Sequence, residues 1–236
     1  MILEYISAAI LISVSLFIIK LIFILPFFKI DSNDTTTKDS GIIDGIKIRN
    51  GKNIEVFIFL GSGGHTGEMI RILQNYKNIL LDGSNVMHVG YSDMDSYNRF
   101  KAMMKEYKCK VNYYEFVKAR KVGAGIVSSI CSITKTLLMS LRIIFQIRIS
   151  MLNKPHLVLL NGPGTCCIIA LYFKLIEWLS LVTDSPNIVY VESLARIDTL
   201  SLSGKILYWL ADEFLVQWKE LKEKNAPRAK FFGILV

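Results

Sequence analysis

Cysteine and histidine are scarce in this sequence of 236 residues, which holds four cysteines and three histidines. The cysteines form no CxxC pair, and no histidine stands at metal-ligand spacing from them. Neither a zinc site nor a disulfide framework is therefore indicated, and a domain that faces the reducing cytosol is the simplest interpretation.

Internal repeats and low-complexity stretches are also absent, and the basic residues are not interleaved with aromatic ones as on a nucleic-acid-binding surface. Lysine and arginine (28) nevertheless outnumber aspartate and glutamate (20), for a formal net charge of +8. This charge favours anionic partners, such as an acidic lipid surface or a phosphorylated substrate. No nucleic acid partner is expected.

One long apolar run, Ile2 to Phe28, opens the chain. The part from Tyr5 to Ile19, with the stem of Lys20, is long enough to span a bilayer. A cleaved signal peptide is the alternative, but this segment begins with an acid and lacks a small-residue cleavage site. Residues 1–29 are therefore predicted to be a single transmembrane anchor, and the basic residues downstream place the main domain in the cytosol.

Residues 30–52 are polar and predict a linker, and residues 53–236 predict one α/β domain. In that domain, short apolar runs typical of strands alternate with longer helical patterns. The strands are expected at residues 54–60, 86–91, 111–117, 156–160, 188–192 and 214–218. The helices are expected at residues 66–81, 96–107, 125–149, 165–181 and 204–211. The alternation predicts a Rossmann-like parallel sheet with helices on both faces.

The predicted helix over residues 125–149 is unusually apolar. Lys135, Arg142 and Arg148 recur in it every six or seven residues and so lie near one face. A basic cluster at residues 118–121 precedes it. Two interpretations remain open: a helix on an anionic membrane surface, or a core helix with one solvated basic stripe.

A glycine-rich loop with the sequence GSGGHTGE, residues 61–68, follows the first predicted strand and opens a helix. Backbone N–H groups at such a helix start can cradle a phosphate or diphosphate. The loop is not a dinucleotide fingerprint, because Thr66 stands where the third glycine belongs, and no lysine follows as in a P-loop. The alternative is a plain glycine turn, with His65 an ordinary loop residue and Glu68 a helix-dipole partner.

Two further strand ends carry polar or glycine-rich residues. They are residues 161–165, with the sequence NGPGT, and Glu192-Ser193 followed by Arg196. In a doubly wound sheet, all three loops gather at the carboxyl edge, where ligands bind. Glu192 is there either a general base or ligand-holding carboxylate, or a cap for the next helix.

Two carboxylates two residues apart, Asp93 and Asp95, could chelate one metal ion as a DxD motif does. The pair also stands where a helix begins, and Asp is a common N-cap residue. The cap interpretation is preferred, so neither a metal site nor a cofactor is expected.

The ordered set of motifs resembles a known family. The resemblance rests on these motifs: the GSGGHT core, the NGPGT loop, Val191-Glu192-Ser193, and the segments Ser203-Gly204-Lys205 and Leu210-Ala211-Asp212. On these residues the chain resembles the membrane-anchoring subunit of the eukaryotic UDP-N-acetylglucosamine transferase that builds dolichol-linked chitobiose. That family is similar to the N-terminal half of the bacterial transferase that makes lipid II. The resemblance implies one half of a GT-B glycosyltransferase.

The resemblance also implies a split, inverting enzyme that needs no metal and acts at the endoplasmic reticulum membrane. This subunit, inactive alone, would bind GlcNAc-diphosphate-dolichol and recruit a cytosolic catalytic subunit that carries the UDP-GlcNAc site. Either His65 or Glu192 would be the base. A non-catalytic membrane scaffold for a partner enzyme is the alternative. The implied substrate-binding residues are Gly61, Ser62, Gly63, Gly64, Thr66, Glu68, Asn161, Gly162, Gly164, Thr165, Ser193 and Arg196.

The last six residues are almost wholly apolar, although chain ends are usually polar and frayed. They form either the final strand of the domain's own sheet or, as the resemblance implies, a tail that docks the catalytic partner. The candidate partner-binding residues are Phe231, Phe232, Ile234, Leu235 and Val236.

Overall fold

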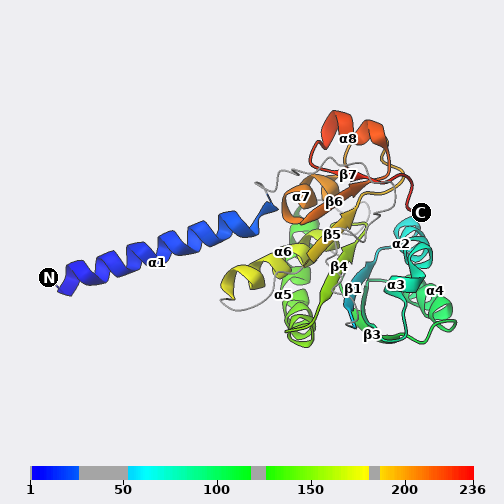
Figure 1. Cartoon of the computed structure of the whole chain (residues 1–236), viewed down its shortest axis with the longest axis horizontal. Helices are drawn as coiled ribbons and strands as arrows, with labels where there is room; N and C mark the ends of the chain where they lie inside the picture. The colour runs from blue at the N-terminus through cyan, green and yellow to red at the C-terminus, as the bar shows by residue number, and fades with distance from the viewer. Residues whose placement is uncertain (1, 27–52, 118–125, 181–186) are drawn as a thin grey trace.

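The computed structural model describes residues 2–26, 53–117, 126–180 and 187–236 (Figure 1). A long helix, α1 (Ile2–Ile24), extends away from an α/β domain. The strands are β1 (Glu55–Leu60), β2 (Val86–Tyr91), β3 (Lys110–Glu115), β4 (His156–Leu160), β5 (Asn187–Val191), β6 (Glu213–Val216) and β7 (Lys230–Phe231). The domain helices are α2 (Gly64–Asn75), α3 (Lys77–Leu80), α4 (Met94–Met104), α5 (Ile126–Ser150), α6 (Thr165–Leu179), α7 (Leu202–Leu210) and α8 (Lys219–Asn225).

The strands form one seven-stranded sheet in the order β3-β2-β1-β4-β5-β6-β7, and every neighbouring pair is parallel. The chain builds outward from β1 to one edge and then returns to add β4 on the other side. The strand order therefore reverses between β1 and β4, which is where ligands bind in such sheets. The predicted Rossmann-like parallel sheet is confirmed.

The sheet is covered on both faces, so β1 is buried along its whole length. Val56, Ile58 and Leu60 face a core cluster with α2 and α4. Phe57 and Phe59 point to the opposite face and pack with residues of α5, α6 and α7. A parallel strand between two helical layers is apolar at successive positions, which explains the continuous run EVFIFL.

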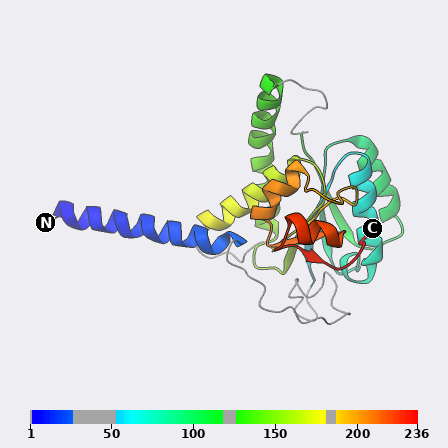
Figure 2. The same ribbon diagram turned by 90° about the horizontal axis from the view of Figure 1, so that it is seen from above.

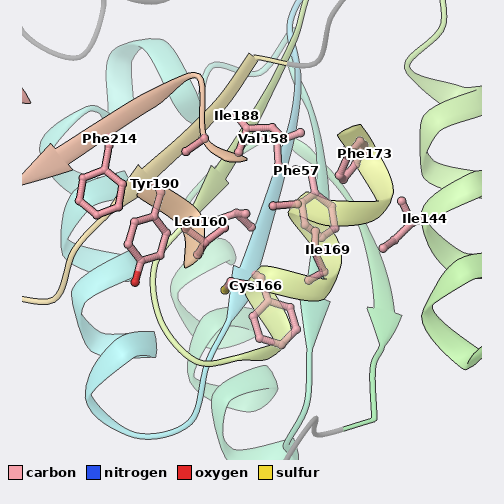
Figure 3. Packing of buried hydrophobic residues seen from close by; sticks show 14 of the residues in the cluster. Phe57, Ile144, Val158, Leu160, Cys166, Ile169, Phe173, Ile188, Tyr190 and Phe214 are labelled. Carbon is pink, nitrogen blue, oxygen red and sulfur yellow. The ribbon is translucent and has the colours of Figure 1, made fainter. Parts of the chain in front are cut away.

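Aromatic rings hold the second layer to the sheet. The ring centroids of Phe57 and Phe173 are 5.8 Å apart, and those of Tyr190 and Phe214 are 5.2 Å apart. Figure 3 shows these rings, with Ile144 of α5 on the side of Phe57 and Phe173. Because α5, α6 and α7 share this cluster, they form one layer on the sheet face from which α1 extends (Figure 1).

Most predicted boundaries agree with the structure to within one or two residues, and the differences have local causes. The helix expected over residues 66–81 is divided into α2 and α3 at Tyr76, whose φ of −110° is not helical. Helix α8 was not predicted, because its sequence KELKEKN buries Leu221 alone and has no apolar stripe. The two-residue strand β7 is too short for an alternating pattern.

Helix α5 combines parts of both interpretations offered for it. Ile144, Ile147 and Met151 are buried in the core. The expected basic stripe is wrong at Arg148, which is buried with its Nη1 atom 3.2 Å from Nε2 of His156, whereas Arg142 is exposed. The side chain of Lys135 and the basic cluster at 118–121 lie outside the described residues.

Helix α1 has the length and composition of a membrane span from Tyr5 to Ile24, and its side chains there are not buried. It is fixed to the C-terminal end of α6. The indole Nε1 of Trp178 donates to the carbonyl oxygen of Phe17 at 2.9 Å, and the two rings pack edge to face. Lys20 also donates to the carbonyl oxygen of Ser180. The predicted linker, residues 30–52, lies outside the described residues.

Candidate functional site

Three strand-end loops meet at the carboxyl edge of the sheet, because β1, β4 and β5 are adjacent. We call them loop 1 (residues 61–63, after β1), loop 2 (161–164, after β4) and loop 3 (192–201, after β5). Loops 1 and 2 flank the point where the strand order reverses. The three predicted motifs are thus brought together as the alternating pattern required.

Loops 1 and 2 approach each other so closely that glycine is required. A Cβ atom on Gly61 would lie 2.7 Å from Cδ of Pro163, and one on Gly162 would lie 3.0 Å from Cγ of His65. Gly162 and Gly63 also have φ values of 128° and 62°, in a region that other residues rarely adopt. The glycines therefore serve close packing and backbone shape together.

Two helices begin at these loops without a side-chain cap. The N-cap residues of α2 and α6 are Gly63 and Gly164, whereas α4 and α7 are capped by Asp93 and Ser201. The first N–H groups of a helix have no partner within the helix, and they carry its positive dipole end. Ser62, Gly63 and Gly64 are exposed. The edge thus presents two helix starts suited to an anion.

Glu68 ties the three loops together. Its Oε1 atom accepts hydrogen bonds from Ser193 Oγ at 2.8 Å and from Leu194 N at 3.3 Å. Its Oε2 atom accepts from Asn161 Nδ2 at 2.8 Å, and the same Nδ2 donates to the carbonyl oxygen of Val191. The carboxylate therefore bonds α2 to loop 2 and loop 3, which makes Glu68 a positioning residue rather than a direct ligand.

Thr66 and Ser96 close loop 1 from the inside. The hydroxyls of Thr66 and Ser96 are in hydrogen-bond contact with each other at 2.8 Å, and both also contact the carbonyl oxygen of Gly61. Both side chains are buried, so Thr66 shapes the loop with its hydroxyl and can meet a ligand only through its backbone. Ser96 was missed from the sequence, where it looked like an ordinary helix-start residue.

The Asp93 carboxylate accepts from both the N–H and the hydroxyl of Ser96, at 2.9 and 3.0 Å. It is thus the N-cap of α4, which agrees with the interpretation preferred from the sequence. Within the described ranges, no group of three or more His, Cys, Asp or Glu side chains is placed to hold a metal ion.

Glu192 is 1% exposed and is surrounded by partners from its own chain. Its Oε2 atom accepts from the N–H and the hydroxyl of Ser201, and its Oε1 atom accepts from Ser193 N. A Cβ atom on Gly204 would lie 1.8 Å from Oε2, so the carboxylate occupies the space at the start of α7. Burial and this carboxylate raise the pKa of Tyr190 far above its usual range. These contacts hold Ser201, the N-cap residue of α7, in place and leave Glu192 without the exposure that a base needs.

His65 is in a different situation. It is half-buried on the first turn of α2, with its ring against Gly162. Its Nδ1 atom is buried and has no hydrogen-bond partner in the described part of the chain, and the same holds for Oδ1 of Asn161. Unpartnered polar atoms at a shared loop contact are uncommon in folded proteins and mark a place for a ligand or a water molecule.

The remaining predicted residues lie on the same edge. Thr165 is buried at the start of α6, and Arg196 is exposed on loop 3. Arg99 of α4 was missed: its Nη2 atom lies 3.9 Å from where a Cβ atom on Gly67 would be. Because no sequence pattern relates Arg99 of α4 to Gly67 of α2, the sequence had no signal that would bring the two residues together.

The C-terminal tail is held next to loop 3. Phe231 extends the sheet in β7, and Leu235 is buried in the core cluster with α2. Leu235 N donates to Gln217 Oε1, and Gln217 Nε2 donates to the carbonyl oxygen of Glu192. The tail thus belongs to the domain's own sheet and core at Phe231 and Leu235, while Phe232 and Ile234 remain exposed.

Comparison with known proteins agrees with these observations. The family described as "Oligosaccharide biosynthesis protein Alg14 like" matches residues 56–235. The Saccharomyces cerevisiae protein named UDP-N-acetylglucosamine transferase subunit ALG14 is 50% identical over 234 residues, which cover 98% of each chain. The Homo sapiens protein of the same name is 32% identical over 194 residues, which cover 78% of this chain and 84% of the human one.

Among solved structures, MurG of Acinetobacter baumannii superposes on 70% of this chain with a TM-score of 0.46 and 11% sequence identity. The chain spans about two fifths (41%) of that structure. The family match covers nearly all of the α/β domain, and the yeast relative aligns over almost the whole sequence. The chain belongs to the Alg14-like family of oligosaccharide biosynthesis proteins.

Proposed function

We propose that the chain is the acceptor-binding subunit of a heteromeric UDP-N-acetylglucosamine transferase, the activity that the names of its relatives carry. In this proposal the complex transfers GlcNAc from UDP-GlcNAc to GlcNAc-diphosphate-dolichol, an early step of N-glycan precursor synthesis. The observation that supports it best is the pair of uncapped helix starts at the reversal of strand order.

The two uncapped helix starts of α2 and α6 together can bind a diphosphate group. The two helix starts come from opposite faces of the sheet and meet at one edge, so each dipole can stabilise one phosphate group. Gly63, Gly64 and Gly164 are exposed and have open space where a Cβ atom would lie, so phosphate oxygens can come close to the backbone there. Thr66 and Glu68 contribute by holding the loops, and the exposed Arg196 and Arg99 add positive charge.

His65 is the better of the two candidates for the base. In an inverting transfer, the acceptor hydroxyl attacks the anomeric carbon, UDP leaves with the electrons of the broken bond, and a base takes the hydroxyl proton. Such a base must reach the substrate. The His65 ring is half-buried and can therefore meet a substrate, whereas Glu192 is 1% exposed and both of its oxygens are occupied by its own chain.

The donor site and the remaining half of the fold would come from a cytosolic catalytic subunit. Phe232 and Ile234 offer it an exposed apolar surface directly after β7. Through Leu235 and Gln217, that surface is bonded to the backbone of Glu192 in loop 3. A partner bound there would therefore adjoin the acceptor site, and the chain alone would be inactive.

The anchor in this proposal is α1, which would cross the endoplasmic reticulum membrane once and leave the domain, residues 53–236, in the cytosol. Its apolar length supports this role, as do its contacts with α6. Protease added to sealed microsomes is expected to digest the domain. Protection of the domain would contradict this orientation.

Reconstitution separates the proposed subunit from a mere scaffold. The full-length chain, purified from membranes, is expected to bring a second protein with it and to form chitobiose-diphosphate-dolichol only in its presence. The variant His65→Ala is the discriminating control. A scaffold would retain full activity with this change as long as the partner still binds, whereas an acceptor-binding subunit would lose turnover.

A further inference from the structure

The outward face of α5 is apolar. Leu138 is 71% exposed and Phe145 is 55% exposed. Three more large apolar side chains of this helix are exposed as well, namely Met139, Leu141 and Ile149. Among the exposed α5 side chains that the structure describes, the charged one is Arg142. A helix that packs its other side in the core normally turns a polar face to water, so this composition indicates a covering partner.

The exposed residues form one stripe. Leu138, Arg142, Phe145 and Ile149 follow each other at intervals of four, three and four residues, so they lie on the same side of the helix. The opposite side carries the residues that pack in the core, such as Ile144. Helix α5 therefore has two apolar sides, and only one of them is covered by its own domain.

The direction of α5 matches a membrane surface. Helix α1 runs lengthwise in both Figure 1 and Figure 2, whereas α5 runs crosswise to it in both views. The two helices are connected through α6, which contacts α1 at Phe17 and packs in the same layer as α5. A bilayer that α1 crosses along its length would thus extend in the direction of the α5 axis, on the side of the sheet covered by α5.

We propose that α5 lies along the surface of the bilayer that α1 crosses and is a second membrane contact of this chain. This rests on the anchoring role proposed for α1. Leu138, Phe145 and Ile149 enter the boundary of the lipid chains, while Arg142 extends its guanidinium to the lipid phosphates. Leu171 and Leu179 of α6, the helix that contacts α1, are exposed as well.

The second contact has a consequence for the acceptor. One span alone would let the domain tilt toward and away from the bilayer. With α5 on the bilayer as well, the domain has one orientation, and the edge with loops 1 to 3 keeps a constant height above the lipid. A lipid-linked diphosphate reaches the site only at a matching height, because its lipid tail stays in the membrane.

Photo-crosslinking tests this contact in the full-length chain. The residue p-benzoylphenylalanine replaces Phe145 in one variant, Leu16 of α1 in a second, and Asn98, exposed on α4 across the sheet, in a third. The purified proteins are placed in vesicles of phosphatidylcholine and phosphatidylserine and irradiated. We expect lipid adducts in the mass spectrum for positions 145 and 16, and at least tenfold fewer for position 98.

The outcomes separate the two ideas. If lipid adducts form at position 16 but are no more abundant at position 145 than at position 98, the α5 contact is overturned and the anchor remains supported. A lack of lipid at position 16 contradicts the anchor, and the α5 proposal falls with it. The same variants are irradiated in the membranes of the producing cells. A protein adduct at position 145 there, in place of lipid, would assign the stripe to a partner subunit or a second copy.

Discussion

His65, on the first turn of α2, and Glu192, at the start of loop 3, are both polar residues at the carboxyl edge of the sheet, but their surroundings give them different roles. The Glu192 carboxylate is buried and accepts hydrogen bonds from Ser193 and Ser201. The His65 ring is half-buried and has an unpartnered nitrogen. A residue bonded on all sides by its own chain stabilises the fold, whereas an unpartnered one is available to a substrate.

This difference can be measured by mutating each residue. We expect His65→Ala to lower the turnover of the assembled complex on the order of a hundredfold, because a general base contributes at least that much. Its thermal midpoint should stay near that of the unchanged protein. Glu192→Ala should also lower the free energy of unfolding, by roughly 1–3 kcal/mol, because it leaves buried donors without an acceptor. Equal stability loss in both variants would contradict the assignment.

Glu68 is expected to act through the loops that it joins. In Glu68→Ala, the hydrogen bonds to Asn161, Ser193 and Leu194 are lost, and loops 2 and 3 are no longer tied to α2. We expect a rise of at least tenfold in the acceptor KM, with the KM for UDP-GlcNAc unchanged. Glu68→Gln keeps an acceptor for Ser193 and should recover part of the loss. If both variants bind acceptor normally, Glu68 does not position the site.

At the scale of elements, β1 and β2 share a buried polar cluster at the end of the sheet opposite the site. His88 lies 2.6 Å from Glu55 through Nε2 and 3.1 Å from the hydroxyl of Tyr114 through Nδ1, and Lys154 also contacts Glu55. Burial lowers the pKa of His88 below its usual value, although Glu55 opposes this shift. The folded state therefore binds a proton at His88 less readily than the unfolded state.

Stability should consequently fall when the solution becomes acidic. Above a pH of about 6.5, His88 is neutral in both states and contributes no pH dependence. As the pH drops through that value, the unfolded chain takes up the proton first, so the thermal midpoint is expected to decrease between pH 7.5 and 5.5. The variant His88→Gln should show a smaller decrease. Because the two proteins differ only at position 88, the difference between the two slopes reports His88.

At the scale of the whole molecule, the tail serves the core and, in our proposal, the partner. Leu235 is buried, so Leu235→Ala should lower the free energy of unfolding by roughly 2–5 kcal/mol. Phe232 and Ile234 are exposed, so Phe232→Ser with Ile234→Ser should leave the thermal midpoint unchanged. We expect this double variant to retain much less of the catalytic subunit on purification. Full recovery of the partner would show that it docks elsewhere.

The layout of the whole molecule was largely readable from the sequence. The apolar N-terminal run, the alternation of strands and helices, and the parallel sheet are local periodic signals, and the structure contains all of them. Helix α8 was missed because charged residues dominate it, and the uniform basic face expected of α5 was wrong at Arg148 because that side chain pairs with His156 in the interior.

The sequence by itself determined which loops would form the candidate site, because parallel strands place all their carboxyl ends on one edge and glycine marks the tight turns. Only the tertiary structure decided what each polar residue does there. Glu68 looked like a possible ligand, yet its partners at residues 161, 193 and 194 come from distant parts of the chain. Hydrogen bonds between such segments depend on packing in three dimensions, which no local pattern encodes.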